Sequence, residues 1–509
     1  SIMIDSCFFL FRKEWKMKES NFIPSYEEGA KYLKDYKYIP ITMEILFDIG
    51  TLVNIFLCIK NVHENAFLLE SVENGDKWGR YSFIAYNPTE KIEVKAGAIS
   101  HYFPDTVNVI DDIEPLEYIN NLILRNKSPK INSDSRFTGG YLGYFSYDTV
   151  RYVEKKLTNI PVDDLELPDI LLFKCSEIIT FDHLTHKLSI TVNIPTEGDY
   201  QKNYLEGIKK ANKILEEITR LNYIYKEEKS ITEPQVKSNI SQLEYITMVE
   251  KAKKRIIEGD IFQVVLSNRF EIENPPEAFS IYRSLRSTNP SPYMYYIQTK
   301  DFAIAGASPE MLVNVQNGKI ITKPIAGTIR RGKDLDEDKV LESKLINDKK
   351  ERAEHTMLVD LGRNDIGKVA EFGSVQVPEY MVIEKYSQLF HITSQVEGEL
   401  REDKTLIDAL KAVLPAGTLS GAPKVKAMEI IDELEKNKRC LYGGTIGYIS
   451  FDGVMDTCIA IRTVLIKGEK AYVQAGAGIV YDSIPEKEYQ ECETKAKAMI
   501  KAIKEASRL

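Results

Sequence analysis

The sequence predicts an α+β fold with antiparallel sheets, and three observations lead to this class. Strand-like segments recur together with helical patterns, but they do not alternate regularly as parallel βαβ units would. A glycine-rich pattern, GG-x-x-GY-x-S-aromatic-D, occurs in residues 139–148 and again in residues 443–452. The chain has 509 residues, 43% of them hydrophobic and 28% charged, and can bury a large core in two to four domains. The repeated pattern indicates either two strands with similar packing or two related β-lobes.

Composition and charge exclude several classes of function. The net charge is −9 and no block of basic residues is present, which argues against nucleic-acid binding. No apolar run reaches the length of about 18 residues that a membrane-spanning helix needs. The six cysteines form no Cys-x-x-Cys pair, which argues against a disulfide framework and a thiolate zinc site. A reducing, cytoplasmic location is therefore expected.

The chain is predicted to contain two domains joined by a polar linker. Met17 offers a natural start, so the residues before it are expected to lie outside the fold. A polar stretch that includes Pro234 has no apolar period and is predicted to be the linker. The predicted parts are an extension (1–16), an N-terminal domain (17–225), a linker (226–239) and a second domain (240–509).

Helical spacing is clear on both sides of the predicted linker. An amphipathic helix is predicted over residues 202–225. After the linker, Ser241 and Glu244 match a capping box at the start of a second helix. A strand rich in Val and Phe is predicted over residues 261–272.

Acidic residues on two predicted helices are candidates for a metal site. Residues 335–361 are predicted to form one helical segment, and Glu351 and Glu354 share one of its faces. The last helix is predicted to start near Pro485, and Glu488, Glu491 and Lys495 share one of its faces. Two carboxylate pairs can hold a hard divalent cation such as Mg²⁺, which takes few protein ligands. The alternative is that both faces are simply solvated.

A second set of candidates suits an anionic ligand. Residues 474–479 (QAGAGI) continue an alternating strand, and their small residues, 475–478, let a ligand approach the backbone N–H groups closely. Residues 417–424 fail the phosphate-loop pattern, because only three residues separate their glycines, and nucleotide binding is disfavoured. Arg462 lies in a strand-like apolar run, where it either pairs with a buried acid or clamps a ligand carboxylate. His391 is either a core residue or a general acid or base.

The second half of the chain also carries a series of motifs in a fixed order. They are ASPE (307–310), PIAGT (324–328), EHTMLVDLGRND (354–365), AGTLSGAPK (416–424), YGG (442–444), Arg462 and QAGAG (474–478). Together they resemble the motifs of the chorismate-utilising enzymes, from about residue 238 to the end. LLES (68–71) and RYSFI (80–84) extend the resemblance, so that the chain from Met17 onward is similar to the large subunits, or component I, of the anthranilate synthases.

This resemblance implies a fold and a reaction. The fold has two antiparallel β-sheets packed as a sandwich-like core with helices on the outside. The reaction is a Mg²⁺-dependent lyase step in which chorismate and ammonia give anthranilate and pyruvate through an aminodeoxyisochorismate intermediate, the first step of tryptophan biosynthesis. Water-adding members of the family carry a Lys where this chain has Gln263, and aminodeoxychorismate synthases carry a Lys where it has Ala326. The alternatives are an aminodeoxychorismate synthase and a catalytically inactive tryptophan-binding protein.

The resemblance also implies residue roles. The expected metal ligands are Glu354 and Glu491, supported by Glu351 and Glu488. The expected catalytic group comprises Glu310 as the general acid for the departing C4 hydroxyl, His391 and Thr418 in the second step, and Gln263 beside the attacking ammonia. The expected substrate-binding residues are Gly327, Thr328, Tyr442, Arg462, Gly476, Ala477, Gly478 and Lys495.

A partner and a regulator are implied as well. The chain has no Cys-x-Gly segment that resembles a glutaminase nucleophile, so ammonia is expected to come from a separate glutamine amidotransferase subunit (component II), in a heterotetramer. The LLES motif implies feedback inhibition by L-tryptophan, the alternative being a β-hairpin packing motif. The expected tryptophan-site residues are Leu69, Glu70, Ser71, Arg80, Pro292, Tyr293, Met294, Ile446 and Tyr448.

Overall fold

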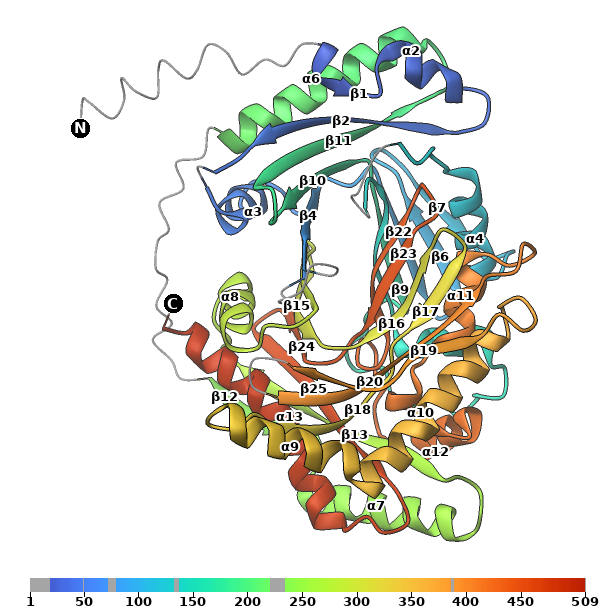
Figure 1. Cartoon of the computed structure of the whole chain (residues 1–509), viewed down its shortest axis with the longest axis vertical. Helices are drawn as coiled ribbons and strands as arrows, with labels where there is room; N and C mark the ends of the chain where they lie inside the picture. Colours follow the sequence, from blue (N-terminus) through green and yellow to red (C-terminus); the bar gives the residue numbers. More distant parts are fainter. Residues whose placement is uncertain are drawn as a thin grey trace.

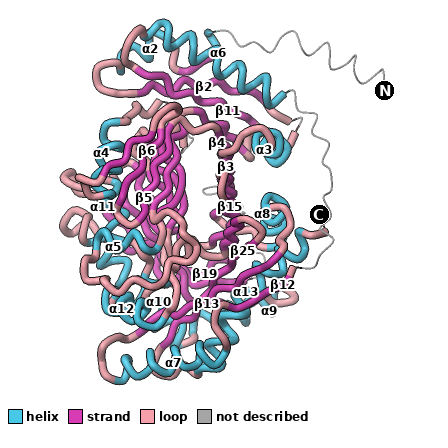
Figure 2. Tube along the Cα trace, turned by 180° about the vertical axis from the view of Figure 1, so that it is seen from behind, coloured by secondary structure: helices cyan, strands magenta, loops and turns pink. Residues whose placement is uncertain are grey.

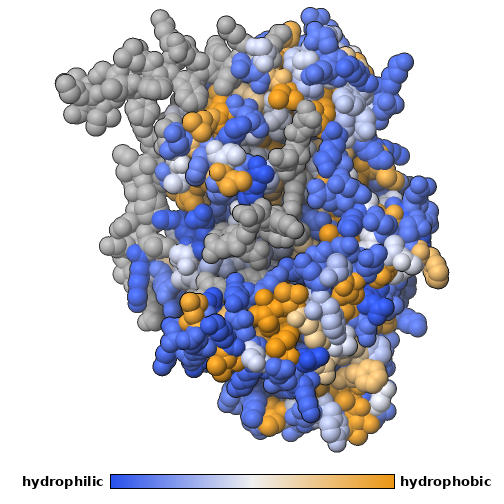
Figure 3. All heavy atoms as spheres, in the orientation of Figure 1, coloured by the Kyte–Doolittle hydropathy of each residue, from blue (hydrophilic) through white to orange (hydrophobic). Residues whose placement is uncertain are grey.

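Two large antiparallel sheets form the centre of the molecule (Figure 1). The computed structural model describes residues 19–48, 50–71, 79–131, 137–219, 234–385 and 389–508. The α+β class is confirmed, and helices cover the outer faces of the sheets (Figure 2). Among the described residues no helix is both long and apolar enough to cross a membrane. The face drawn in Figure 3 is mainly hydrophilic, with scattered hydrophobic spots.

The first sheet contains strands from both halves of the sequence. Its members are β1 (Phe22–Ile23), β2 (Tyr38–Leu46), β3 (Ala66–Glu70), β4 (Tyr81–Tyr86), β10 (Glu177–Asp182), β11 (Lys187–Pro195), β12 (Gln235–Ser238), β13 (Gln263–Glu273), β14 (Tyr293–Gln298), β15 (Phe302–Ser308), β21 (Gly421–Ala422), β24 (Thr463–Lys467) and β25 (Lys470–Ile479). Their order is β1-β2-β11-β10-β4-β3-β14-β15-β24-β25-β13-β12, with β21 paired to β13.

The second sheet is built in the same way. Its members are β5 (Glu90–Lys95), β6 (Ala98–Tyr102), β7 (Val107–Ile110), β8 (Gly140–Phe145), β9 (Ile170–Cys175), β16 (Met311–Gln316), β17 (Lys319–Thr322), β18 (Ile325–Arg330), β19 (Gln376–Lys385), β20 (Leu389–Glu399), β22 (Thr445–Ser450) and β23 (Met455–Ile459). Their order is β18-β20-β17-β16-β23-β22-β8-β9-β5-β6-β7, with β19 paired to β20.

The helices pack on the outer faces of these sheets. The α-helices are α2 (Tyr26–Gly29), α3 (Leu52–Lys60), α4 (Pro115–Arg125), α5 (Val150–Val153), α6 (Tyr200–Thr219), α7 (Gln242–Ile257), α8 (Ala278–Thr288), α9 (Leu335–Asn347), α10 (Lys349–Gly367), α11 (Leu406–Val413), α12 (Lys424–Leu434) and α13 (Pro485–Ala506). Short 3₁₀ helices are η1 (Glu19–Asn21), η2 (Ala30–Tyr32), η3 (Tyr147–Thr149) and η4 (Gly417–Leu419).

The two halves of the chain are related by an internal repeat. Outward from the centre of the first sheet, the N-terminal order β3-β4-β10-β11-β2-β1 matches the C-terminal order β14-β15-β24-β25-β13-β12. The two copies of the glycine-rich pattern form β8 and β22, which pair with each other so that Gly143 lies opposite Gly447. Because matched strands meet at the middle of both sheets, the arrangement favours two related halves over a chance similarity of two strands.

The predicted domain division needs a correction, because the halves share both sheets. Strand β3 pairs with β14, and β8 pairs with β22, so the backbone ladders run across the predicted boundary. Within the predicted linker, Gln235–Ser238 forms β12 and pairs with β13. The extension 1–16 and residues 226–233 of the linker lie outside the described residues.

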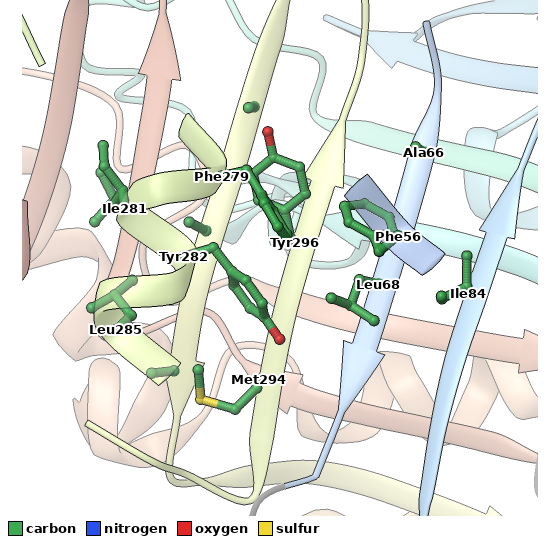
Figure 4. Packing of buried hydrophobic residues seen from close by; sticks show 14 of the residues in the cluster. Phe56, Ala66, Leu68, Ile84, Phe279, Ile281, Tyr282, Leu285, Met294 and Tyr296 are labelled. Atoms are coloured by element: carbon green, nitrogen blue, oxygen red, sulfur yellow. The ribbon is translucent and has the colours of Figure 1, made fainter. Parts of the chain in front are cut away.

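Three buried layers hold the sheets and helices together. Successive residues of β3 point to opposite sides: Phe67 packs between the two sheets, whereas Leu68 packs under the helices of the first sheet. In β8, Tyr141 faces the helices of the second sheet and Leu142 faces the first sheet. Figure 4 shows the helix side of the first sheet, where Phe279 of α8 and other buried side chains pack over the central strands. This layering is the expected sandwich-like core.

Several local predictions are confirmed, with one exception. The capping box of Ser241 and Glu244 is present at the start of α7, and Pro485 begins α13. The helix predicted over 202–225 corresponds to α6, and its residues 220–225 lie outside the described residues. The long helical segment before residue 361 is in fact two helices, because Asp348 ends α9 and its side chain accepts hydrogen bonds from the first N–H groups of α10.

Candidate active site

Helix α10 carries one pair of the predicted carboxylates toward β18. Its His355 is fully buried and makes a 2.6 Å hydrogen bond to the hydroxyl of Ser394 on β20, which fixes the helix against the sheet. Glu351 then reaches β18, since a Cβ added at Gly327 would lie 3.2 Å from its Oε2. Gly327 has a φ of 74° within a break in the β18–β20 register, a bulge that only glycine adopts easily.

Helix α13 carries the second pair of carboxylates. Glu491 pairs with Lys495 at 2.9 Å, and Lys495 also donates to the carbonyl of Gly476 at 3.0 Å. Burial, and then the charge of Glu491, raises the pKa of Glu488. Burial raises the pKa of Glu351 too, followed by the charges of Glu354, Asp348 and Glu491. The charge of Glu491 on α13 therefore acts on Glu351 of α10.

The fit of these carboxylates to Mg²⁺ rests on the chemistry of their donors. All four predicted ligands offer hard carboxylate oxygens. Burial and, after it, neighbouring negative charge raise the pKa values of Glu351 and Glu488, and a cation would neutralise that charge. In the part of the chain that the structure describes, no group of three or more His, Cys, Asp or Glu side chains is arranged to hold a metal. The four carboxylates suit a hard divalent cation such as Mg²⁺ through the chemistry of their oxygen donors alone.

Glu310 is a buried acid in the turn between β15 and β16. The hydroxyl of Thr418 donates to its Oε1 at 3.1 Å. Burial raises the pKa of Glu310 to about 8, although the Thr418 hydrogen bond and the charges of Arg462 and Lys495 act in the opposite direction. The side chain is therefore largely protonated at neutral pH and is able to donate a proton.

His391 is shifted in the other direction. It lies on β20 opposite Thr328 of β18, and its Nδ1 is 2.8 Å from the Thr328 hydroxyl. Burial, helped by the positive charge of Arg462, lowers the pKa of His391 to about 4. The imidazole is therefore neutral at pH 7 and is able to accept a proton.

The positive charge of Arg462 lowers the pKa of both Glu310 and His391. This residue was predicted to lie within a strand. Instead β23 ends at Ile459 and β24 begins at Thr463, and Arg462 adopts a left-handed backbone with a φ of 49°. Such a conformation is uncommon for a residue other than glycine, and strain of this kind is often found at functional sites.

The glycines of β25 allow two polar side chains to approach the strand. A Cβ at Gly476 would lie 2.8 Å from the Tyr442 hydroxyl, and a Cβ at Gly478 would lie 2.6 Å from Nε2 of Gln263. The side chain of Ala477 belongs to the buried core instead, so only its backbone is available to a ligand. Strand β24 pairs with β25 only as far as Val473, which leaves that edge of the glycine segment unpaired by β24.

The structure thus brings several of the predicted site residues together on α10, α13, β18, β20 and β25. Three separate contacts show this: Thr418 with Glu310, Thr328 with His391, and Glu351 with the backbone at Gly327. Sequence reasoning missed His355 and Ser394, because a buried helix-to-strand hydrogen bond leaves no local pattern.

A second cavity, of about 940 Å³ including its mouth, lies between the two halves. It is lined by eight of the nine residues predicted for tryptophan, namely Leu69, Glu70, Ser71, Pro292, Tyr293, Met294, Ile446 and Tyr448. Tyr81, Phe83, Lys323 and Asp456 also line it and were missed, because non-local strand pairing brings them there. The buried Ser71 hydroxyl has no hydrogen-bond partner among the described residues.

Two of the predicted cavity residues behave differently from expectation. Arg80 does not line the cavity; its guanidinium forks onto Asp182 at 2.8–3.2 Å and lies over the Tyr81 ring. Glu70 lines the cavity, but its carboxylate accepts hydrogen bonds from Tyr282 and from Arg286, the latter at 2.9 and 3.1 Å. Glu70 is therefore already neutralised by Arg286 and is a weaker partner for a ligand ammonium than its position in the sequence indicated.

Comparisons with known proteins agree with the family indicated by the motifs. A family model described as chorismate binding enzyme matches residues 64–501. Anthranilate synthase component 1 from Acetivibrio thermocellus is 48% identical over 96% of this chain and 100% of its own length. The protein of the same name from Aquifex aeolicus is 45% identical over 94% of this chain and 97% of its own length. A crystal structure of anthranilate synthase component I from Streptococcus pneumoniae superimposes with a TM-score of 0.74 at 41% identity, over 90% of this chain and 98% of the other.

Proposed function

The chain belongs to the chorismate binding enzyme family, and we propose that it works as the large component of an anthranilate synthase. In this role it converts chorismate and ammonia to anthranilate and pyruvate. One observation carries the chemical part of the proposal. Glu310 and His391, both within the field of Arg462, have pKa values displaced in opposite directions, to about 8 and about 4. Such a pair supplies a proton donor and a proton acceptor at the same pH.

In the first step ammonia forms a bond to ring C2 while the C4–O bond breaks. Glu310 gives its proton to the leaving hydroxyl, which departs as water. Gln263 cannot deprotonate a nucleophile, and this suits ammonia, which attacks as a neutral amine. Ala326 has no nucleophilic group, so no covalent bond to the enzyme forms at that position. The amine proton released after attack passes to solvent, and the product of the step is aminodeoxyisochorismate.

In the second step a proton leaves C2, the enolpyruvyl C–O bond breaks and the ring becomes aromatic. The neutral imidazole of His391, oriented by Thr328, is the base that the site offers for this proton. The departing enolpyruvate takes up a proton to become pyruvate. Glu310, hydrogen-bonded to Thr418, regains from solvent the proton that it gave up in the first step.

Substrate binding is assigned to the cationic and backbone groups around β25. Arg462 and Tyr442 hold the carboxylate of the enolpyruvyl arm, aided by backbone groups of Gly327, Gly476 and Gly478. The carboxylates of α10 and α13 would hold Mg²⁺, which would supply positive charge for the anionic substrate. Lys495, bonded to both Glu491 and the Gly476 carbonyl, keeps α13 close to this strand.

Ammonia is supplied by a separate glutamine amidotransferase in this proposal. A glutaminase of the cysteine type needs a reactive thiolate, and burial raises the pKa of each of the five described cysteines: Cys58, Cys175, Cys440, Cys458 and Cys492. A thiol with a raised pKa is a poor nucleophile at neutral pH. The isolated chain should therefore use ammonium salts but not glutamine.

The cavity between the halves is proposed to bind L-tryptophan as a feedback inhibitor. Met294, Tyr293 and Ile446 offer apolar walls to an indole, and the unpartnered Ser71 hydroxyl offers a polar contact. Strand β22 supplies Ile446 to this cavity and follows closely after Tyr442 of the active site. Occupancy of the cavity thus acts on an element next to the substrate-binding Tyr442.

The experiment that tests the function is an assay of the purified chain with chorismate, Mg²⁺ and ammonium. Fluorescent anthranilate and an equal amount of pyruvate are expected, and glutamine alone should not replace ammonium. Accumulation of aminodeoxychorismate without pyruvate would support the aminodeoxychorismate synthase alternative. Tryptophan binding without any turnover would support an inactive tryptophan-binding protein.

A further inference from the structure

A buried ion pair lies beneath the substrate-binding region and takes no part in the proposed chemistry. Arg439 and Glu435 are both buried, and the guanidinium binds the carboxylate through two bonds of 2.6 and 2.8 Å. The remaining donors of Arg439 reach the carbonyls of Leu419 at 2.6 Å and Val265 at 2.7 Å. Glu435 also accepts hydrogen bonds from the backbone N–H and the hydroxyl of Ser267, at 2.8 and 2.9 Å.

The partners of this pair belong to separate segments of the active site. Leu419 directly follows Thr418, whose hydroxyl donates to Glu310. Val265 lies on β13 close to Gln263, and Ser267 is paired across the ladder with Gly476. The pair thus bonds at once to the turn that contacts the general acid and to β13, which carries Gln263 and pairs with the glycine segment of β25.

The same guanidinium also contacts the aromatic ring that faces the substrate. Its central carbon lies 5.6 Å from the ring centre of Tyr442 and 4.8 Å from that of Tyr147, which belongs to the N-terminal half. A guanidinium over aromatic faces is attracted by their π-electrons, and this attraction strengthens when the groups are buried. Tyr442 is therefore held between Arg439 and the close approach of its hydroxyl to Gly476.

Stability alone is a weak reason for such a pair. Removing two charges from water costs several kcal/mol each, and well-packed apolar residues often serve a core equally well. What apolar residues cannot do is fix several backbone carbonyls and a carboxylate at set distances, because those contacts need donors in a fixed fork.

We propose that Arg439 and Glu435 are positioning residues, which hold Tyr442, the Thr418 turn and β13 in the mutual arrangement that turnover of chorismate requires. This inference rests on the proposed function, since its readouts use chorismate. It assigns the pair no contact with substrate. Its effect is transmitted through the bonds to Leu419, Val265 and Ser267.

The main test is Arg439→Lys in the full chain, assayed with chorismate, Mg²⁺ and ammonium. Lysine keeps the positive charge but loses the planar fork. The KM for chorismate is expected to rise by about tenfold or more, because Tyr442 and the strand beside it are no longer fixed together. A larger share of aminodeoxyisochorismate should be released before pyruvate is expelled, which chromatography of the products measures. A purely structural role would alter the amount of folded protein but neither of these quantities.

The matched control is Arg151→Lys. Arg151 also makes two hydrogen bonds to one carboxylate, that of Asp432 on α12, at 2.7 and 2.8 Å. Its other hydrogen bonds go to Asp148 and Leu157. Its loss should lower thermal stability while leaving KM and the product ratio within about twofold of the wild-type values.

Ser267→Ala is the second variant, in case Arg439→Lys does not fold. It removes the hydroxyl bond to Glu435 and the bond that the same hydroxyl accepts from Gln474, and it leaves the ion pair intact, so it keeps the buried charges balanced. A rise in KM of about threefold is expected. The proposal is overturned if the folded variants at 439 and 267 match Arg151→Lys in KM and product ratio. If wild-type chain makes no anthranilate, the proposed function fails, and chorismate-binding affinity of the same variants still tests the positioning role.

Discussion

Replacing Glu310 by Gln should abolish most activity and yet stabilise the protein at neutral pH. The buried carboxyl has a pKa of about 8, against 4.5 for an ordinary glutamate. Glutamine has nearly the same shape, and its carbonyl is able to accept the Thr418 hydrogen bond. Without an acid at this position, kcat is expected to fall by about 10²–10⁴-fold.

The size of the stability change follows from the two pKa values. Below pH 4.5 the carboxyl is protonated in both the folded and the unfolded chain, and it contributes no pH-dependent cost. As the pH rises toward 8, ionisation of the carboxyl stabilises the unfolded chain, while in the folded chain the carboxyl stays largely protonated. The native state therefore loses stability progressively. At pH 7 this loss amounts to about 3 kcal/mol, which Glu310→Gln should recover.

Urea unfolding of both proteins at pH 5 and pH 7, followed by intrinsic fluorescence, measures this difference. The midpoint of Glu310→Gln should lie above that of the wild type at pH 7 and approach it at pH 5. Glu397→Gln is the control, because the pKa of Glu397 is lowered, its carboxylate pairs with Lys319 at 3.0 Å and its loss should destabilise. The reasoning would be refuted if Glu310→Gln were less stable than the wild type at pH 7. It would also be refuted if the two midpoints differed by the same amount at pH 5 and pH 7.

Three further changes probe separate parts of the site. Gly476→Ala places a methyl group 2.7 Å from the Leu266 carbonyl oxygen and 2.8 Å from the Tyr442 hydroxyl, and it should raise the KM for chorismate by about tenfold. Gly468→Ala, at a turn with no neighbour within 4 Å of its Cβ, should leave KM unchanged. Equal KM values would count against a substrate-binding role for this part of β25. Glu491→Ala should weaken the Mg²⁺ dependence of activity, and an unaltered Mg²⁺ titration would remove Glu491 from the metal site. Ser71→Val should weaken inhibition by tryptophan without changing kcat, and unchanged inhibition would show that this hydroxyl is not a tryptophan contact.

The local elements were predictable because their causes are local. Ser241 and Glu244 cap α7 through contacts three residues apart, and the last helix begins at a proline that suits its first turn. The face of α10 that carries Glu351 follows from helical spacing alone. Short-range patterns do not record the pairing of β8 with β22, which joins residues about three hundred positions apart, and so the shared sheets were not predicted.

In the candidate site, too, some features could be predicted from the sequence and others depend on long-range contacts. Motif residues such as Glu310 and His391 were chosen from the family resemblance, but their opposite pKa values depend on burial that the fold creates. The backbone break at Arg462 and the engagement of Glu70 by Arg286 were missed for the same reason. Each arises from contacts between strands and helices that are distant in the chain.

The pH dependence of kcat tests the central claim most directly, namely that Glu310 acts as a protonated acid beside a neutral His391. The rate should be measured with saturating chorismate and corrected for the fraction of ammonium present as free ammonia. It should be nearly constant between about pH 5 and 7 and fall as Glu310 ionises above a pKa of about 8. A corrected rate that remains constant or rises through pH 9 would contradict the account.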